Sequence, residues 1–304
     1  MKALWSTLVM ALFFLLIHSA YAGNFGNLNF GTYNVRNFGT VEFKADVTTN
    51  KFLLKTLIAK TSADVLAVQE IVDDELFKSF IKESLPQYNL ILSECGGSGN
   101  QKVGILYNKE KLKLNWSKED NRIANGESCQ AGIRPAMVAQ FQMKDSHLNF
   151  QVIAVHLKAG GRPQNIEARF KQLEILSQMV EELRSQKMDY IAIMGDFNST
   201  EYLEDASAAA RFKKVVRDND LIDFAEDIDC SSYWKGPEND EVMRYASLLD
   251  HVMISKEFHQ QFKYDSARTL AHCQKNSCRQ ETVDGLGLTY NEVSDHCPVV
   301  AKLR

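Results

Sequence analysis

The sequence lacks several features that would divide it into parts or place it in a membrane. Its 304 residues include only 5 prolines, and there is no Pro- or Ser-rich linker, low-complexity segment or repeat with a period of about 20–50 residues. Residues 23–304 contain no apolar run of the roughly 20 residues that a membrane-spanning helix needs. We therefore expect residues 23–304 to form a single domain with a large buried core.

The sequence also lacks an excess of positive charge. Lys and Arg total 35 and Asp and Glu total 39, and the formal net charge is −4. Proteins that bind nucleic acid without sequence preference usually carry a basic face, because the release of counterions from phosphates drives their binding. The charge balance disfavours such a tight binder and leaves open an enzyme that binds weakly and turns over fast. An acidic cluster that holds a divalent metal would account for part of the imbalance.

The first 22 residues have the pattern of a signal peptide. Lys2 gives a positive start, Leu8–Ile17 an apolar core, and Ala20-Tyr21-Ala22 a cleavage site. The apolar core is short for a membrane anchor, and no cysteine follows the cleavage site, which disfavours a lipoprotein. We predict cleavage after Ala22 and a secreted or periplasmic protein without stable membrane association.

An even number of cysteines in an exported chain favours disulfides. The six cysteines are Cys95, Cys129, Cys230, Cys273, Cys278 and Cys297. Cys273 and Cys278 could close a small loop, Cys95 and Cys129 flank a Gly/Asn-rich segment, and Cys230 with Cys297 would be the remaining pair, although connectivity cannot be read from sequence. A zinc site at His272, Cys273 and Cys278 is the alternative.

The stretch from Tyr190 to Ser199 suggests a functional strand end. An isoleucine-rich apolar run, long enough for a buried strand, is broken by Gly195 and followed by Asp196 and Asn198. On an extended chain these two side chains share one side. A carboxylate and an amide presented together suit a metal-bound oxyanion, although Gly-Asp-x-Asn also makes an ordinary turn.

Other apolar runs end in the same kind of polar residue. Asn34, Glu70, His156, Asp250 and Asp295-His296 each lie at the end of a run or next to one. Open α/β sheets place ligands at strand ends, so these ends look like strands that converge on one site. Between them, apolar residues at helical spacing predict helices over residues 48–60 and 165–186. Further helices are expected over residues 73–85 and 205–216.

Six motifs stand in the order seen in the endonuclease/exonuclease/phosphatase superfamily, and the chain most closely resembles its DNase I-like branch. They are Thr32-Tyr33-Asn34-Val35-Arg36-Asn37-Phe38-Gly39, Val68-Gln69-Glu70, Ala154-Val155-His156-Leu157-Lys158, Gly195-Asp196-Phe197-Asn198, Leu249-Asp250-His251-Val252 and Ser294-Asp295-His296-Cys297-Pro298. The resemblance runs from about Leu28 to the C-terminus. It implies a four-layer α/β/β/α sandwich of two mixed sheets flanked by helices. The implied activity is divalent-metal-dependent hydrolysis of phosphodiesters by a monomeric enzyme, with DNA, and RNA as well, as expected substrates.

The resemblance also implies roles for individual residues. Glu70, with Asn34 or Asp295, would hold Mg²⁺ or Mn²⁺, and Ca²⁺ could serve as a structural ion. His296, held by Asp250, would be the general base. The remaining roles fall to five residues: His156 as the second histidine, Asp196 orienting the water or a metal, Asn198 donating to the pentavalent phosphorus, and Arg36 and Arg134 contacting substrate phosphates.

Structural explanations exist for the same residues. Asn34 could cap its own turn, Arg36 could be solvated, Arg134 could form a structural ion pair, His156 could be a core histidine, and Glu70 could cap the following helix, although Asp73 or Asp74 is available for that task. His251 points to the other face of its strand and is expected to be structural. The aromatics Tyr233 and Trp234 could stack on a base or pack, and we favour packing.

Two features leave other functions open. Gly99 and Gln101 stand where a DNase I-like enzyme usually has an aromatic and an acidic residue, which puts contacts with a DNA groove in doubt. The same site serves phosphodiesterases that act on sphingomyelin-like lipids and phosphatases that act on inositol phosphates, although the sequence shows no clear exposed hydrophobic hairpin for a membrane enzyme. A non-catalytic binding or toxin-delivery module is a more remote alternative, because no catalytic residue is lost.

Overall fold

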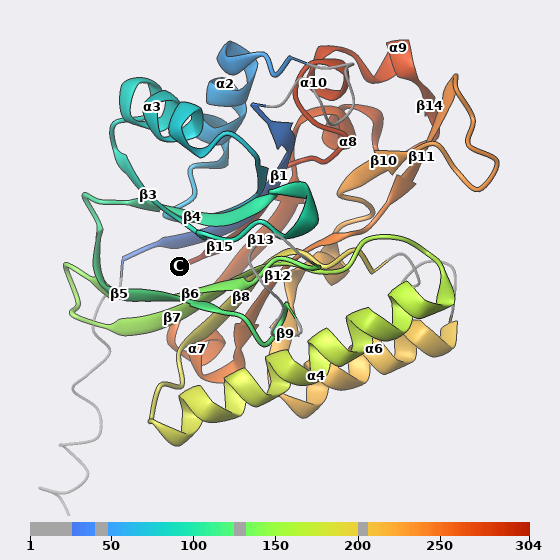
Figure 1. Cartoon of the computed structure of the whole chain (residues 1–304). Helices are drawn as coiled ribbons and strands as arrows, with labels where there is room; N and C mark the ends of the chain where they lie inside the picture. The colour runs from blue at the N-terminus through green and yellow to red at the C-terminus, as the bar shows by residue number, and fades with distance from the viewer. Residues whose placement is uncertain (1–25, 40–47, 125–131, 200–205) are drawn as a thin grey trace, which may run out of the picture.

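In a computed structural model, two six-stranded mixed sheets pack face to face and helices cover their outer faces (Figure 1). The structure describes residues 26–39, 48–124, 132–199 and 206–304, so the predicted signal peptide lies outside the described residues. The four layers confirm the architecture expected from the sequence motifs. No helix in the described ranges is long and apolar enough to cross a membrane.

The first sheet joins the beginning of the chain to its end. Its strand order is β13-β15-β1-β2-β4-β3. The strands are β1 (Leu28–Phe38), β2 (Val65–Ile71), β3 (Tyr88–Leu92), β4 (Lys102–Asn108), β13 (Tyr264–Thr269) and β15 (Val299–Leu303). β1 is parallel to β2 and antiparallel to β15, so the sheet is mixed.

The second sheet carries the central part of the chain. Its strand order is β5-β6-β7-β8-β12-β9. The strands are β5 (Leu112–Asp120), β6 (Ala136–Met143), β7 (Asn149–His156), β8 (Ile191–Asp196), β9 (Leu221–Asp223) and β12 (Asp250–Ser255). β7 and β8 are parallel and β8 and β12 antiparallel, and these three strands form the middle of the sheet.

Helices close the two outer faces. α2 (Lys51–Thr61) and α3 (Asp74–Ser84) cover the first sheet, and α4 (Pro163–Ser185) and α6 (Ala206–Asp218) cover the second (Figure 1). All four helices were predicted from the sequence, with bounds that differ by a few residues. Asn50 caps α2 by accepting from the Leu53 amide, and Asp73 caps α3 by accepting from the Leu76 amide. Because Asp73 takes the capping task, Glu70 is not the helix cap.

A smaller sheet stands beside the sandwich. It consists of β10 (Ser232–Trp234), β11 (Met243–Ser247) and β14 (Glu281–Thr282) in the order β10-β11-β14. Short helices surround it or connect the larger elements: α7 (Lys256–Gln261), α8 (Ala271–Asn276), α9 (Val283–Leu286) and α10 (Leu288–Asn291), with the 3-10 turns η1 (Gly97–Gly99) and η2 (Phe224–Asp227). Tyr233 N donates to Asp295 O at 2.9 Å, which attaches this sheet to the segment before β15.

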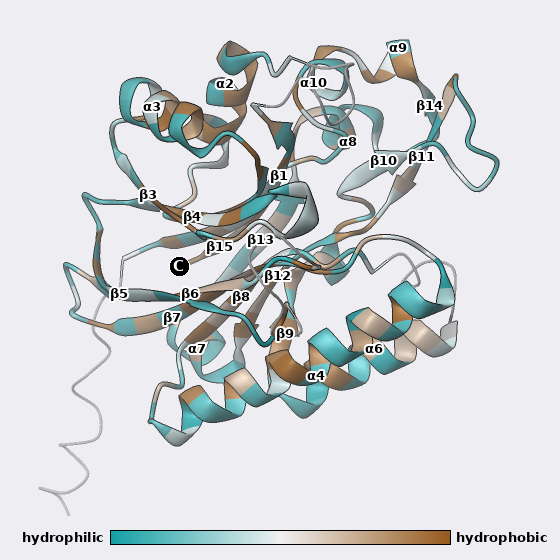
Figure 2. Ribbon diagram, viewed as in Figure 1, coloured by the Kyte–Doolittle hydropathy of each residue, from teal (hydrophilic) through white to brown (hydrophobic). Residues whose placement is uncertain are grey.

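Three apolar layers hold the sandwich together. One lies between the sheets and contains Phe30, Phe150 and Phe258, whose rings meet edge to face or tilted at 5.4–5.8 Å between centroids. The other two lie between each sheet and its helices. The helices are accordingly hydrophobic on one side and polar on the other (Figure 2). Burial of this apolar surface is the main force that holds the strand ends in register.

The disulfides differ from the pairs that the sequence suggested. Cys230 is bonded to Cys278 and Cys273 to Cys297, so the expected Cys273–Cys278 and Cys230–Cys297 pairs are wrong. Cys273 lies within α8, whereas Cys278 lies beyond its end, where the backbone turns left-handed at Ser277 and Cys278. The same bonds exclude the zinc alternative. Cys95 is also disulfide-bonded, while Cys129 lies outside the described residues.

Candidate active site

Three of the expected site residues stand in one row at the end of the second sheet. His156 on β7 is paired with Asp196 on β8, and Asp196 is paired with Asp250 on β12. Residues opposite one another on neighbouring strands project to the same face. The row therefore presents an imidazole and two carboxylates side by side, all of them buried.

Asn34 connects this row to the first sheet. Its Nδ2 donates to Asp196 Oδ2 at 3.0 Å and to Glu70 Oε1 at 3.2 Å. The β1–β2 ladder changes register between Asn34 and Phe38, and the β2–β4 ladder between Val68 and Ile71. Bulges of this kind re-aim side chains next to active sites. The irregularities turn Asn34 and Glu70 toward the second sheet.

Glu70 is held in an unusual backbone conformation by its neighbours. Its φ is 63°, a left-handed value that is rare for a glutamate. Asn37 N donates to Glu70 Oε2 at 2.9 Å, and Gln101 Nε2 donates to Asn37 Oδ1 at 2.7 Å. With Asn34 on the other oxygen, both carboxylate oxygens are fixed in direction. The sequence analysis did not identify Asn37 as a site residue, although it lies inside the first motif. It also did not predict that Gln101 holds Asn37.

His296 and Asp250 form a close pair. His296 Nδ1 lies 2.7 Å from Asp250 Oδ2, and His296 Nε2 lies 3.8 Å from Asp196 Oδ2. Ser231 Oγ accepts from the Asp250 amide at 2.9 Å. Burial acts to lower the pKa of His296, but the negative charges of Asp250 and Asp196 outweigh it and hold that pKa well above its usual value.

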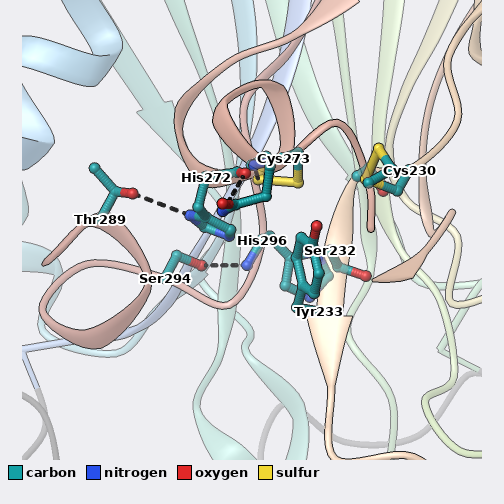
Figure 3. Close-up of a disulfide and its surroundings, with 12 residues drawn as sticks. Cys230, Ser232, Tyr233, His272, Cys273, Thr289, Ser294 and His296 are labelled. Carbon is teal, nitrogen blue, oxygen red and sulfur yellow. Dashed lines mark hydrogen bonds between the residues drawn. A yellow bond between two sulfur atoms is a disulfide. The ribbon is translucent and has the colours of Figure 1, made fainter. Parts of the chain in front are cut away.

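The segment around His296 is held from several sides (Figure 3). Ser294 Oγ accepts from the His296 amide at 3.0 Å and donates to Asn34 O at 2.7 Å. The next residue, Cys297, is bonded to Cys273 of α8. These contacts fix His296 relative to both sheets before any substrate binds.

Asp196 carries the most strongly perturbed carboxyl group of the row. Burial, with the charge of Asp250, raises its pKa to about 7, although His296 and Asn34 oppose the rise. Its Oδ1 accepts from the Asn198 amide at 2.9 Å. Asn198 has a φ of 52°, and its Nδ2 donates to Leu157 O at 3.2 Å. The Gly-Asp-x-Asn stretch thus makes a local turn and at the same time places Asp196 in the cluster.

His156 lies against Arg134 rather than in an apolar pocket. Arg134 Nε donates to His156 Nδ1 at 3.1 Å, and Arg134 Nη2 is 2.7 Å from His156 Nε2. His156 Nε2 is 3.4 Å from Asp196 Oδ2 and 3.9 Å from Glu70 Oε1. Burial, with the positive charge of Arg134, lowers the pKa of His156 well below its usual value, so the ring is neutral.

The Arg36 side chain makes its contacts outside this cluster. The backbone turns at Arg36 and Asn37, with φ of 47° and 50°. Arg36 Nη2 donates to Asn291 O at 3.1 Å, and the guanidinium lies 5.9 Å from the centre of the Tyr290 ring. Asp295 is partly exposed, and no described group of three metal-ligating side chains joins it to Glu70.

The cluster has the chemistry to hold a hard cation. Asp196, Asp250 and His296 offer ligand atoms within 4.8 Å of one another, and Glu70 adds a carboxylate whose side chain is 15% exposed. Asp250 Oδ1 has no hydrogen-bond partner in the described part of the chain. Carboxylate oxygens whose directions are fixed by amide donors suit Mg²⁺, Mn²⁺ or Ca²⁺.

His251 has the structural position that its sequence register predicted. It is fully buried, its Nδ1 lies 2.7 Å from Asp223 Oδ2, and its ring packs against Phe197 and Phe212. It therefore faces the helices on the outer side of the second sheet. Adjacent residues Asp250 and His251 thus serve opposite faces of one strand.

Comparison with known families and structures agrees with this geometry. Residues 27–304 match the model of the Endonuclease/Exonuclease/phosphatase family. No curated protein matches the chain in sequence.

Solved structures with the same fold come from bacteria and animals. A mannosyl-6-phosphatase from Bacteroides thetaiotaomicron is 18% identical with a TM-score of 0.62, over 91% of this chain and 99% of that one. D. rerio TDP2, solved with a single strand DNA product, is 18% identical with a TM-score of 0.63, over 92% and 100%. The human Nocturnin catalytic domain, solved with bound sulfate, is 16% identical with a TM-score of 0.60, over 91% and 94%. At these identities the likeness is one of fold.

Proposed function

Because the chain belongs to the endonuclease/exonuclease/phosphatase family, we propose that it hydrolyses phosphodiester bonds, with DNA as the principal substrate and RNA as a second. The observation that carries the proposal is the His296–Asp250 pair, which faces Asp196 across the strand ends. Nuclease activity also draws support from D. rerio TDP2, a protein of the same fold that was solved with a single strand DNA product.

We assign proton transfer from the attacking water to His296. Its Nδ1 is occupied by Asp250, so Nε2 is the atom that can accept the proton of a water. Asp250 then stabilises the imidazolium that forms, and Asp196 orients the water. Because the pKa of His296 is raised, the neutral ring that can accept a proton becomes more populated as pH increases, and activity should rise toward alkaline pH.

The opposite side of the cluster would receive the phosphate. Arg134 supplies a buried positive charge, and Asn198 an amide donor that adds no charge. His156 would contact a phosphate oxygen through Nε2 once the Arg134 guanidinium, whose Nη2 lies 2.7 Å from that nitrogen, turns to the phosphate. In line with the sequence motifs, Arg36 would contact a neighbouring phosphate at the rim of the site.

A divalent cation is part of this proposal. Glu70 would hold Mg²⁺ or Mn²⁺, with Asn34 positioning its carboxylate and Asp295 as a further ligand from the rim. When bound, the ion would neutralise charge on the phosphate and stabilise the leaving oxygen. The two amide donors to Glu70 fix its carboxylate for this task without competing positive charge.

We further propose that the enzyme acts outside the cytoplasm as a monomer made of one domain over residues 23–304. The signal-peptide pattern of Met1–Ala22 supports export. The disulfides Cys230–Cys278 and Cys273–Cys297 are typical of oxidising compartments.

The proposal is tested by nicking of supercoiled plasmid with purified residues 23–304, in Mg²⁺, in Mn²⁺ and in EDTA, at neutral and alkaline pH. We expect nicking that needs metal and that falls by about 10²- to 10⁴-fold in His296→Ala, the range for loss of a proton-transfer group. His259→Ala is the matched control, because α7 follows the opposite end of β12 from Asp250. It should retain full activity.

Two outcomes would contradict parts of the proposal. Equal nicking in EDTA would exclude metal dependence. No nicking in Mg²⁺, Mn²⁺ or Ca²⁺ would exclude DNA as the substrate, and RNA, choline phospholipids, inositol phosphates and sugar phosphates would then be assayed with the same variants.

A further inference from the structure

One large aromatic side chain is exposed next to the site. The described residues include four exposed large hydrophobic side chains: Phe52, Trp234, Val242 and Leu288. Trp234 is 39% exposed and lies on β10, the strand that is attached to the segment carrying His296. An exposed indole can serve as a stacking surface, so its position relative to His296 matters.

Ser232 and His296 face each other across this attachment. They form an antiparallel bridge, flanked by hydrogen bonds from Tyr233 N to Asp295 O at 2.9 Å and from Cys297 N to Ser231 O at 2.7 Å. This pattern makes Ser232 and His296 a non-hydrogen-bonded pair, in which the α-carbons are about 4.5 Å apart and the side chains are close. Their side chains therefore project to the same face.

Trp234 must share that face. It stands two residues after Ser232 on the same strand, and alternate residues of a strand point the same way. In the register that the Ser232–His296 bridge sets, it lies diagonally across from His296. Tyr233 points the other way, is buried, and donates its hydroxyl to Arg279 O at 2.9 Å. Packing, expected for both aromatics, is found for Tyr233 and not for Trp234.

The residues around Trp234 on the β10–β11 hairpin support its position. Tyr245 on β11 is its cross-strand partner, so the two rings lie on one face. A Cβ on Gly236, whose φ is +76°, would lie 2.7 Å from the Tyr245 ring, so the hairpin backbone rests directly against that ring. Lys235 is paired with both carboxylate oxygens of Glu241, at 2.7 and 2.8 Å. The cation next to Trp234 in sequence is thus paired with a carboxylate.

We propose that Trp234 is a stacking platform, supported by Tyr245, on which a nucleobase of the substrate lies while its phosphate is at His296. This inference rests on the proposed function and adds that the enzyme recognises bases, without sequence preference. A base is joined to its phosphate through one sugar, which suits a platform that is a diagonal neighbour of the catalytic residue. The chain has a net charge of −4, so stacking would supply binding that its overall charge does not.

Fluorescence can isolate this contact. Residues 23–304 contain two tryptophans, Trp116 and Trp234, so Trp116→Phe leaves Trp234 as the reporter. This variant is titrated in EDTA with a single-stranded oligodeoxynucleotide and with an abasic tetrahydrofuran chain of equal length and charge. We expect the base-containing chain to quench the indole emission and to bind about 5- to 100-fold more tightly than the abasic chain.

Substitutions then assign the difference to Trp234. In Trp234→Ala, with affinity measured by anisotropy of labelled chains, the gap between the two chains should close, while Trp234→Phe should keep most of it. Phe52→Ala, which removes an exposed aromatic on α2, should keep the whole gap. Equal affinity of wild-type protein for both chains, binding of neither, or a gap that survives in Trp234→Ala would overturn the proposal.

The same titrations separate this inference from the proposed function. If the protein binds bases through Trp234 but nicks no plasmid, only the proposed hydrolysis of DNA is contradicted, and the stacking platform stands. If the protein nicks plasmid with metal but binds the base-containing and abasic oligonucleotides equally, only the stacking platform is contradicted, and the proposed hydrolysis stands.

Discussion

At the scale of single residues, the site is ordered mainly by amide groups. Asn34 bridges the carboxylates of Asp196 and Glu70, the Asn37 amide holds Glu70, and Gln101 holds Asn37. Amide donors direct a carboxylate without neutralising it. The cluster therefore keeps its negative charge available for a cation. Without a bound cation, that buried charge lowers the stability of the folded protein.

The effect of the buried charge on the free energy of unfolding should be measurable at Asp196. Its pKa is raised from 3.8 to about 7, so below about pH 4 the carboxyl group is protonated in both the folded and the unfolded chain. Between about pH 4 and 7 the unfolded chain releases the proton while the folded chain keeps it, so stability falls as pH rises. Asp196→Asn cannot ionise. Its free energy of unfolding relative to wild type should rise over this window, by an amount on the order of 4 kcal/mol.

Urea unfolding in EDTA at several pH values checks this expectation. Activity of Asp196→Asn should be lost at every pH, because Asp196 is a member of the reacting cluster. A stability difference that does not change between about pH 4 and 8 would show that burial of Asp196 does not raise its pKa.

The sequence predicted most of these residues but not their connections. Asn34, Glu70, His156, Asp196, Asp250 and His296 could be named because each ends an apolar run inside a short motif. Asn37 and Gln101 could not, because their parts depend on left-handed turns at residues 36, 37 and 70.

At the scale of elements, the position of Asp196 depends on close contact between β7 and β8. Gly195 precedes Asp196 and has a φ of +153°, and a Cβ there would lie 2.0 Å from Val155 O. Only glycine allows the two strands to approach at this point. Gly195, which interrupts the isoleucine-rich run in the sequence, thus allows β8 to lie against β7.

Gly195→Ala should therefore be severely destabilising. The added methyl must push β8 away from β7, and we expect a loss of more than about 3 kcal/mol or failure to fold. Gly99→Ala is the matched control, because a Cβ there meets only ordinary contacts at 3.4 Å. Urea unfolding of both variants measures the effect, and similar midpoints for the two would refute this account of Gly195.

Long elements could be predicted from the sequence, and short ones could not. α2, α3, α4 and α6 follow apolar residues at helical spacing over 11–23 residues. β10, β11 and β14 span 2–5 residues and contain no apolar run, so no pattern marks them. Their place beside His296 is fixed by strand pairing and disulfides, which depend on the whole fold.

At the scale of the whole molecule, the two described disulfides brace the periphery of the site rather than the sandwich. Cys230–Cys278 spans 48 residues and Cys273–Cys297 spans 24, and both tie the region of α8 to strands next to His296. Closing loops of these lengths stabilises the folded chain by about 3–4 kcal/mol each in the chain-entropy model. The three apolar layers of the sandwich contain none of these cysteines.

Reduction should consequently lower activity before it unfolds the protein. With both bonds opened by a reductant, we expect at least about a tenfold loss of activity while far-UV circular dichroism is retained, since the His296 segment loses its brace. Removal of the reductant and reoxidation should restore activity. Full activity in protein whose thiols titrate as completely reduced would show that the bonds do not position His296.

The pairing of β1 with β15 also determines when the protein can act. Leu28 is opposite Leu303, Asn34 stands near one end of the sequence, and His296 and Ser294 stand near the other. When the first 290 residues have been translated, the chain still lacks His296. It also lacks β15, so one edge of β1 is unpaired. The site is consequently assembled only once the segment that carries His296 has been made and β15 has paired with β1.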